Sequence, residues 1–326
     1  MTLPSTFRGY VYESFGDYQE VIKFRSDLTH KPLASNQVRV RVHSAALNPG
    51  EYKVIEYGAR MLPTPPTPEE PFGIGFDFAG TLVEVGQDVN DLTVGDEVYG
   101  MVDLDMGSFA EYLVVGAESV AFKPHKVSFD HAAGVPIAGL TSYQAFTKHA
   151  RFQSGQRVLI LAGSSATGLF GIQMAKVLGA SFAAVTASAR NHELVKSYGA
   201  DLAIDYTTEK WADVLEPNSI DFIYSCGVEP NAWNENAKRV LKKNTGVFVT
   251  IDLADPPLVS PVGATFILMR AVGSKADLTS LAELMDAGKI VTPIDSVHPF
   301  ENLLEAVKKL KSNRARGKII LQIASA

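Results

Sequence analysis

The chain has 326 residues, 46% hydrophobic and 20% charged, and its 36 acidic and 30 basic residues give a formal net charge of −6. This length allows two domains with substantial cores, and the composition is that of a globular protein. The acidic balance disfavours a nucleic-acid surface, so nucleic acid is not an expected partner. The single cysteine, Cys226, excludes an intramolecular disulfide and a cysteine-rich zinc site.

No apolar run in the sequence approaches the length of a membrane span, so no membrane association is expected. The first eight residues lack the apolar core of a signal peptide. With one cysteine and no recognisable address, the sequence predicts a reducing intracellular compartment, the cytoplasm.

Residues 1–125 are expected to be rich in β-strands. The clearest strand is 37–45, where Val38, Val40 and Val42 alternate with polar side chains in the pattern of a half-buried strand. The other strands are expected at 8–11, 20–24, 78–86, 96–101, 108–115 and 120–123. Strands this short and closely spaced favour a barrel or a rolled sheet. The prolines of 62–71 predict an extended loop between them.

From about residue 128 the hydrophobic period changes to alternating helices and strands. Helices are expected at 130–140, with Asp130 as N-cap, and at 141–150. Strands are then expected at 158–162, 182–187, 202–206, 220–226 and 246–252, separated by helices including 191–199, 207–215 and 231–242. This alternation predicts a doubly wound parallel sheet. The last portion, with strands 264–272 and 317–323 and helices 277–287 and 300–312, is expected to return to the first domain.

The turn after the strand 158–162 is the first candidate site. It reads Ala162-x-x-Ser165-x-x-Gly168 and is followed by a helical pattern, so a strand, a turn of small residues and a helix come in succession. This is the context in which a loop binds a dinucleotide, because the helix N-terminus offers free N–H groups to a pyrophosphate. The departure from G-x-G-x-x-G leaves an ordinary turn as the alternative. The candidate cofactor-binding residues are Ser164, Ser165, Ala166, Thr167 and Gly168.

The end of the next strand bears on the choice of cofactor. NAD sites usually place an acidic residue there to bind the ribose 2′-hydroxyl. Here Ser188 and Arg190 follow the strand, and no carboxylate occurs before Glu193. A hydroxyl and a guanidinium suit a 2′-phosphate, so the sequence predicts NADPH. The alternative is that Arg190 simply begins the next helix in solvent.

Several short stretches, in this order and spacing, resemble the medium-chain dehydrogenase/reductase superfamily in its zinc-free quinone oxidoreductase (zeta-crystallin-like) branch. The stretches are 45–53, 73–80, 94–98, 107–112, 139–143, 162–168 and 317–321. The resemblance covers nearly the whole chain. It implies an α/β protein with a GroES-like β-rich catalytic domain plus a Rossmann doubly wound parallel sheet. We expect the catalytic domain at 1–127, the NADPH-binding domain at 128–262 and a segment at 263–326 that rejoins the catalytic domain. The resemblance also implies NADPH-dependent hydride transfer and a homodimer.

The residues argue against a metal. Zinc-dependent members of the superfamily place a cysteine just after the strand that ends here near Ala45, whereas this chain has Leu47 and Asn48 there and no cysteine before Cys226. His125 and His131 are not spaced as paired ligands on a helix and have no thiol or acid cluster beside them. Without a Lewis acid, acceptors that take hydride unaided become the expected substrates, namely quinones and activated C=C bonds of enals or enones.

The resemblance places two candidate catalytic residues after the strand that ends near Ala45. Asn48 is expected beside the nicotinamide, where its amide can donate to a developing oxyanion; alternatively it only caps the strand. Tyr52 is expected to bind substrate or supply a proton, or else to pack. Thr141 resembles a threonine that contacts the nicotinamide amide or a phosphate, and a buried helix hydroxyl is the alternative.

The remaining cofactor candidates also come from the resemblance. They end the fourth and fifth strands of the parallel sheet or belong to the closing motif: Cys226, Gly227, Ile251, Leu253 and Lys318. Ser165 replaces the central glycine of the loop, so its hydroxyl either reaches the phosphates or crowds them. Three functions stay open: an NADPH:quinone oxidoreductase, which we favour, an alkenal/alkenone double-bond reductase, and a non-enzymatic NADPH-binding sensor or crystallin-like protein.

Overall fold

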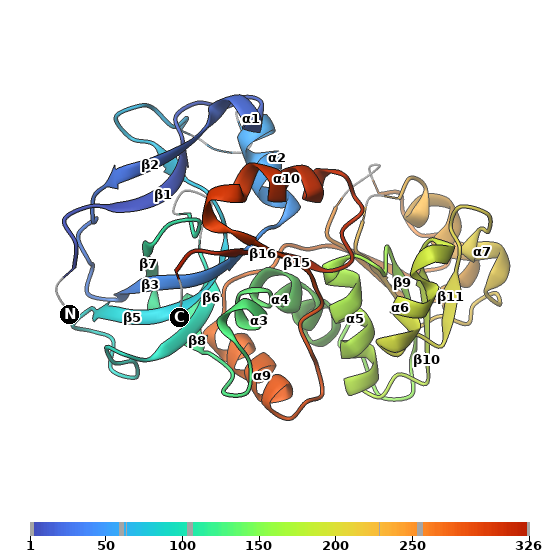
Figure 1. Ribbon diagram of the computed structural model, residues 1–326. Coiled ribbons are helices and arrows are strands. Elements are labelled where there is room, and N and C mark those ends of the chain that lie inside the picture. The colour runs from blue at the N-terminus through green and yellow to red at the C-terminus, as the bar shows by residue number, and fades with distance from the viewer. Residues whose placement is uncertain are drawn as a thin grey trace. The chain divides into compact units, whose positions relative to one another are not determined.

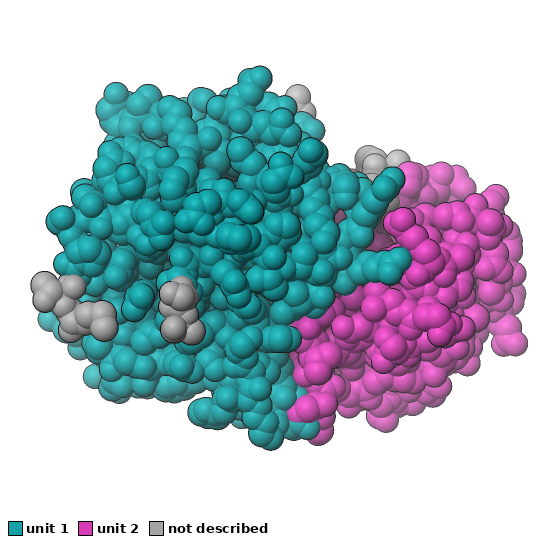
Figure 2. Space-filling model, viewed as in Figure 1, with its two compact units in different colours: residues 1–137, 273–287, 294–326 teal, residues 138–272, 288–293 magenta. Residues whose placement is uncertain are grey.

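The computed structural model describes residues 3–58, 62, 64–102, 107–227, 229–252 and 257–324. The chain divides into two compact units, coloured separately in Figure 2: residues 1–137, 273–287 and 294–326 form the first, and residues 138–272 and 288–293 the second. The chain therefore leaves the first unit after residue 137 and returns after residue 272, later than the expected boundaries at 127 and 262.

The first unit contains a seven-stranded sheet drawn from both ends of the chain (Figure 1). Its strands lie in the order β15-β16-β3-β5-β6-β8, and β7 also pairs with β3. Their bounds are β3 (Gln37–Ala46), β5 (Asp77–Val85), β6 (Glu97–Met101), β7 (Tyr112–Gly116), β8 (Val120–Phe122), β15 (Ile294–Pro299) and β16 (Lys318–Gln322). The alternation predicted for β3 places Val38, Val40 and Val42 in the core, fully buried.

A three-stranded sheet in the order β2-β1-β4 and several helices complete the first unit. Its strands are β1 (Phe7–Tyr12), β2 (Ile22–Leu28) and β4 (Phe72–Gly73), and its helices are α1 (Tyr18–Val21), α2 (Pro49–Tyr57), α3 (Phe129–Ala133), α9 (Lys275–Asp286) and α10 (Leu303–Lys311). Helices α1 and α2 and strands β4 and β15 were not among the expected elements. The first two residues of the expected strand 20–24 are the end of α1.

Asp130 was expected to cap a helix, and this prediction is wrong. Helix α3 begins at Phe129, and its N-cap is Ser128, two residues before the expected one, whose side chain accepts from the backbone N–H of His131. The Asp130 carboxylate instead accepts from Ser44 Oγ at 2.5 Å and from Gln322 Nε2 at 2.8 Å. It therefore ties the helix to β3 and β16, which distant parts of the chain supply.

The second unit contains a six-stranded sheet whose strand pairs are all parallel, in the order β11-β10-β9-β12-β13-β14. Its strands are β9 (Arg157–Leu161), β10 (Phe182–Thr186), β11 (Leu202–Ile204), β12 (Phe222–Ser225), β13 (Val247–Thr250) and β14 (Thr265–Leu268). The order reverses direction at β9, and in such sheets nucleotides bind outside the carboxyl ends of the strands at that point.

Helices precede the first of these parallel strands and lie in most of the connections between them, as is usual for a parallel sheet. They are α4 (Pro136–Gln144), which begins in the first unit, α5 (Ala166–Val177), α6 (His192–Ser197), α7 (Trp211–Val214) and α8 (Lys238–Val240). The expected helix 231–242 is a π-helical segment, Ala232–Ala237, followed by α8. Strand β14 pairs with β13 from Val247 opposite Thr265, so residues 263–272 belong to the second unit and not to the segment that rejoins the first.

Candidate functional site

The loop between β9 and α5 is held by its own small residues. Ala162 adopts a left-handed backbone with φ of 56°, which turns the chain sharply out of β9. Ser165 is the N-cap of α5: its hydroxyl oxygen accepts from Gly168 N at 3.0 Å and its hydrogen is donated to Ala162 O at 2.8 Å. The Ser165 hydroxyl is therefore committed to the loop itself, and the roles expected for it toward phosphates stay predictions.

Two glycines let the loop approach its neighbours closely. A Cβ on Gly168 would lie 2.6 Å from both Ala162 O and Gly163 Cα, which are backbone atoms that cannot move aside. A Cβ on Gly163 would lie 1.9 Å from Cγ1 of Val185 on β10. The first N–H groups of α5, at Ala166 and Thr167, have no carbonyl partner inside the helix. The loop thus presents backbone donors and the positive end of a twelve-residue helix, a combination that suits a phosphate.

A second group of polar side chains lies beside this loop. Asn191 is the last residue of the 3₁₀ turn Ala189–Asn191 after β10, and its Nδ2 donates to Ser164 Oγ at 3.1 Å and to Ser188 Oγ at 3.3 Å. Only 5% of Asn191 is exposed, and its Oδ1 is buried without a hydrogen-bond partner. Two serines predicted separately as cofactor residues are thus joined by one buried amide.

The end of β10 carries the guanidinium expected for a 2′-phosphate. Arg190 is exposed, and no acceptor among the described residues binds its guanidinium. Asp205, at the end of the neighbouring strand β11, is already engaged: it accepts from Thr207 N at 3.0 Å and from Thr207 Oγ1 at 2.7 Å. These hydrogen bonds lower the pKa of the Asp205 carboxyl below its usual range.

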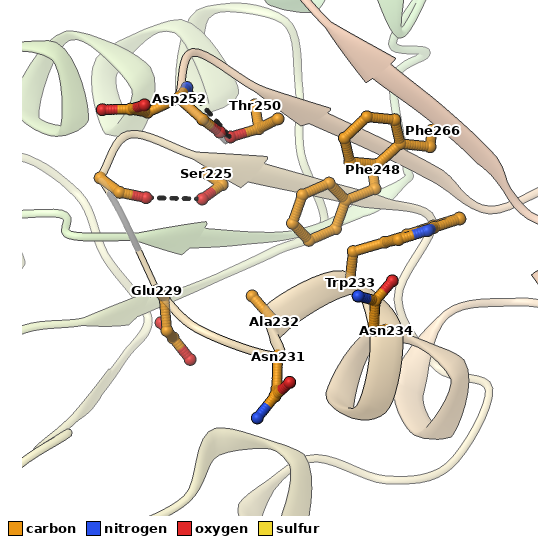
Figure 3. A pocket seen from close by; sticks show the side chains of 11 residues that line it. Ser225, Glu229, Asn231, Ala232, Trp233, Asn234, Phe248, Thr250, Asp252 and Phe266 are labelled. Carbon is orange, nitrogen blue, oxygen red and sulfur yellow. Dashed lines mark hydrogen bonds between the residues drawn. The ribbon is translucent and has the colours of Figure 1, made fainter. Parts of the chain in front are cut away.

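The carboxyl ends of β12 and β13 border a small pocket of about 30 Å³, shown in Figure 3. Its aromatic side consists of Trp233, Phe248 and Phe266, with the last two rings stacked at 5.8 Å between centroids. On the other side Ser225 Oγ donates to Gly227 O at 3.1 Å and Thr250 Oγ1 donates to Asp252 O at 2.6 Å, as the dashed lines show. A volume of this size holds only one or two water molecules. These hydroxyls therefore shape the strand ends.

The first unit contains a buried cluster of four polar side chains: Asn48, Glu51, Asp77 and Lys318, each at most 6% exposed. Lys318 Nζ donates to Asn48 Oδ1 at 2.7 Å and to Asp77 Oδ2 at 2.8 Å. Asn48 Nδ2 in turn lies 3.1 Å from Asp77 Oδ2 and 3.2 Å from Glu51 Oε1. The second oxygen of Asp77 accepts from Ile137 N at 2.9 Å. The Lys318 ammonium is thus bound by one carboxylate and one amide oxygen away from water, and the Glu51 carboxyl joins the cluster through the Asn48 amide.

Burial makes the charge state of Glu51 unusual. Its removal from water raises the pKa of the Glu51 carboxyl to about 8, although the hydrogen bond from Asn48 N and the Lys318 ammonium both oppose the rise. The cluster holds two carboxyl groups against one ammonium, so a neutral Glu51 leaves a balanced Asp77–Lys318 pair. Glu51 Oε2 accepts from Asn48 N at 2.6 Å, which fixes the first turn of α2.

The two candidate catalytic residues differ in their surroundings. Both amide hydrogens of Asn48 face protein acceptors, including Ala46 O at 3.3 Å, so the donation to an oxyanion expected from the sequence would have to replace one of these contacts. These contacts are long, and two hydrogens are shared among three acceptors. Tyr52 is partly buried and packs against the core of the first unit, and Lys311 Nζ lies 5.2 Å from its ring centroid. The catalytic roles of Asn48 and Tyr52 stay predictions.

Comparison with protein-family models and with known proteins identifies the relatives of this chain. The model of the alcohol dehydrogenase GroES-like domain matches residues 34–126, and the model described as zinc-binding dehydrogenase matches residues 198–321. A 2-methylene-furan-3-one reductase of Solanum lycopersicum is 35% identical over 98% of this chain and 80% of its own length. A chloroplastic NADPH-dependent alkenal/one oxidoreductase of Arabidopsis thaliana is 34% identical with the same coverage.

Among solved structures, the quinone oxidoreductase from Coxiella burnetii has a TM-score of 0.84 and 28% identity, covering 98% of this chain and all of that one. The chain belongs to the medium-chain dehydrogenase/reductase family, in its zinc-independent quinone oxidoreductase branch. It is therefore an oxidoreductase, and the expected fold class, a GroES-like domain with a Rossmann sheet, is confirmed.

The other residues that the family resemblance singled out lie in ordinary structural surroundings. Thr141 is buried in α4. Cys226 is buried, which raises the pKa of its thiol and leaves it unreactive. Gly227 borders the pocket of Figure 3, and Ile251 donates its N–H to Ser225 O at 3.3 Å. Leu253 lies outside the described residues. The cofactor contacts expected of all these residues, and of Lys318, stay predictions.

Two further properties of this family member concern metals and membranes. Among the described side chains, no group of three or more histidine, cysteine, aspartate or glutamate residues is arranged to hold a metal ion. Within the described ranges, none of the helices combines the length and the apolar character needed to cross a bilayer.

The sequence analysis missed Asn191, Glu51 as a buried acid, and Asp77. A weak signal existed for Asn191, since Asn is a common N-cap, but the pattern gives no sign that its side chain turns to another loop. Asp77 stands inside the family stretch 73–80, so a charged residue within an apolar strand was the available signal. Buried charges usually have partners, but the partner of Asp77 is 241 residues away in sequence.

Proposed function

We propose that this protein is an NADPH-dependent reductase that transfers hydride to quinones without a metal. The observation that carries the cofactor choice is the polar group after β10: Ser188 and Arg190 stand where NAD sites have a carboxylate, and Asp205 is engaged with Thr207. A guanidinium that meets no acceptor among the described residues, together with a serine hydroxyl, suits the 2′-phosphate that distinguishes NADPH from NADH.

The residues of the β9–α5 loop fit a dinucleotide. Gly163 packs closely against β10 and Gly168 against the backbone of the loop itself, and the α5 N-terminus leaves backbone N–H groups for a pyrophosphate. The hydroxyl hydrogens of Ser164 and Ser188 have no acceptor among the described residues. When bound, the reduced nicotinamide supplies the hydride, and the chain supplies binding, orientation and exclusion of water.

On the acceptor side, the chemistry needs a group that stabilises negative charge on an oxygen. Asn48 is our candidate, since its amide is held by the Lys318 ammonium at Oδ1 and shares two hydrogens among three acceptors. The longest of its three contacts, to Ala46 O at 3.3 Å, is the weakest, so replacing it by a contact with a substrate oxygen would lose the least interaction energy. Quinones are the preferred acceptor class, because both product oxygens can be protonated by water without a protein acid.

A second candidate function is reduction of the C=C bond of alkenals or alkenones. The names of two relatives favour it, one an alkenal/one oxidoreductase and the other a 2-methylene-furan-3-one reductase. In this reaction a carbon must be protonated after hydride transfer, which gives Tyr52 a task as proton donor. The same cofactor site serves both reactions, so only the acceptor distinguishes them.

The test is steady-state oxidation of NADPH with 1,4-benzoquinone, 9,10-phenanthrenequinone, an alkenal and an alkenone, with NADH in parallel. Turnover with the quinones alone supports the first function and removes Tyr52 as a required acid. Turnover with the alkenal or alkenone moves the protein to the double-bond reductases. Equal use of NADH would contradict the cofactor proposal, and no turnover despite tight NADPH binding would favour a sensor.

We also propose a homodimer in the cytoplasm. Strand β14 is an edge of the parallel sheet, and its Leu268 side chain is 50% exposed, which suits pairing with a second copy. Size-exclusion chromatography with light scattering tests the dimer. A single buried cysteine is consistent with a reducing compartment, which fractionation of cells tests.

A further inference from the structure

The contacts of Asn191 reach beyond its own turn. Asn191 is the residue before α6, a position at which an asparagine normally caps the helix with its side chain. Here no cap hydrogen bond forms, and the amide turns instead to Ser164, 27 residues earlier, and to Ser188. Ser188 likewise precedes a 3₁₀ turn without capping it. Neither residue caps the element that it precedes, and the Asn191 amide joins the turn after β10 to the β9–α5 loop.

The hydrogen-bond direction decides what the serines can do. A serine hydroxyl has one hydrogen to donate and two lone pairs to accept with. Because Nδ2 of Asn191 can only donate, it occupies a lone pair on Ser164 Oγ and another on Ser188 Oγ. Each hydroxyl hydrogen must then point away from the amide, and neither meets an acceptor among the described residues. Both serines are left as donors.

The neighbouring Ser165 shows the opposite arrangement. Its hydroxyl donates to Ala162 O and accepts from Gly168 N, so it has no hydrogen left for a ligand. Of these two consecutive serines, Ser165 stabilises the loop and Ser164 can donate to a ligand. The two differ because the Asn191 amide donates to Ser164 and not to Ser165. The Oδ1 of Asn191 is buried and meets no donor among the described residues, which costs the fold stability.

We propose that Asn191 is a positioning and selectivity residue of the cofactor site, which turns the hydroxyl hydrogens of Ser164 and Ser188 toward the phosphate groups of NADPH. The inference rests on the proposed function, because it assumes a nucleotide at the β9–α5 loop. Ser164 stands at the N-terminus of α5, where a pyrophosphate binds, and Ser188 follows β10, where the ribose 2′ position is recognised. Asn191 thus links the part of the site common to NADPH and NADH with the part specific to NADPH.

The test measures the equilibrium binding of NADPH and NADH through the fluorescence of the bound nicotinamide. The binding of 2′,5′-ADP and ADP is measured by calorimetry. Hydrogen bonds to a charged group contribute enough that losing one lowers affinity about 10-fold or more. Ser188→Ala should weaken NADPH and 2′,5′-ADP to that extent and leave NADH unchanged. Ser164→Ala should weaken NADPH and NADH alike.

Asn191→Asp is the decisive variant. A carboxylate accepts from both serines, turns their hydrogens inward and adds a negative charge, so NADPH should lose at least about 10-fold in affinity and NADH distinctly less. Asn302→Asp, at an exposed asparagine before α10, controls for added charge and should change neither affinity. If Asn191→Asp does not fold, the pair Asn191→Ala and Ser188→Ala replaces it. Their effects on NADPH binding should then be non-additive, because the amide acts through that serine.

The outcomes separate the two proposals. If the wild-type protein binds NADPH but Asn191→Asp binds both nucleotides as the wild type does, the role of Asn191 is overturned and the proposed function stands. An equal loss for NADPH and NADH in Asn191→Asp would overturn its part in selectivity. If the wild-type protein binds neither nucleotide, the proposed function fails and this inference fails with it.

Discussion

The two polar sites of this protein differ in how their hydrogen-bonding groups are satisfied. In the first unit, Lys318, Asp77 and Asn48 satisfy one another within a cluster that excludes water. In the second unit, Ser164 and Ser188 accept from one amide, their own hydroxyl hydrogens meet no acceptor in the part of the chain that the structure describes, and Arg190 is exposed. The polar groups of the first site hydrogen-bond to one another, whereas the two serine hydroxyls of the second site can still donate.

This difference indicates different roles. A closed cluster contributes through the energy of its internal pairs, so changing one member should be measured first as a change in stability. A site with unused donors contributes little to stability and should be measured first as a change in ligand affinity. Asn48 belongs to the buried cluster and was also predicted to act in catalysis, so a role in stability and a role in ligand chemistry both apply to this residue.

The largest expected effect is that of Lys318→Met. The substitution leaves the buried Asp77 carboxylate without its cation, which should lower the free energy of unfolding by about 3–5 kcal/mol. Urea denaturation of the purified protein measures this, with Lys289→Met at an exposed lysine as the control. An effect no larger than that of the control would mean that the cluster does not stabilise the first unit.

The next effect is a pH dependence that Glu51→Gln should remove. The pKa of Glu51 rises from 4.5 to about 8 in the folded protein, so the folded state holds a proton that the unfolded state has released between those values. The resulting stability is complete below pH 4.5 and is lost as the pH rises through about 8. Between pH 6 and pH 7.5, the titration of Glu51 should lower the free energy of unfolding of the wild type by about 2 kcal/mol.

Urea denaturation at pH 6 and pH 7.5 compares the wild type with Glu51→Gln, whose neutral amide does not titrate. The variant should lose less stability over that interval by about the amount given by the linkage relation. Equal losses in the two proteins would show that Glu51 is ionised in the folded state at pH 6.

A smaller effect distinguishes the adjacent serines. Ser165→Ala removes the N-cap of α5 and should lower the unfolding free energy by about 1 kcal/mol. Ser164→Ala leaves one hydrogen of the buried Asn191 amide without its acceptor, so it should also lower the unfolding free energy by about 1 kcal/mol, and it should in addition weaken nucleotide binding. Thermal unfolding and NADPH titration of both variants measure the contrast, and weaker NADPH binding in Ser165→Ala than in Ser164→Ala would contradict the assignment of the two hydroxyls.

The smallest expected effect is that of Arg190→Ala. An exposed guanidinium contributes about 0.2–1 kcal/mol to an ion pair, so the affinity for NADPH should fall by no more than about fivefold and that for NADH should not change. The loss should shrink as salt is raised, because exposed charges are screened. An equal loss for NADH would assign Arg190 to the common part of the nucleotide.

The sequence predicted those features that repeat along the chain. The alternation of Val38, Val40 and Val42 indicated β3, and the succession of apolar runs and helical patterns indicated the parallel sheet. Features that depend on a local competition were predicted less well. Ser128, not Asp130, caps α3, because Asp130 has partners on β3 and β16 that no local pattern reveals.

The sequence by itself determined the βαβ unit around Ala162–Gly168, the missing acid after β10 and the single cysteine, because each is a property of neighbouring residues. Only the tertiary structure decided that Asn48 meets Lys318, 270 residues later, and that burial there keeps a proton on Glu51. Only the tertiary structure, likewise, set Ser164 apart from Ser165, since the two are chemically identical and differ only in which groups face their oxygens. Hydrogen-bond direction and burial depend on contacts across the fold, and the order of residues does not encode these contacts locally.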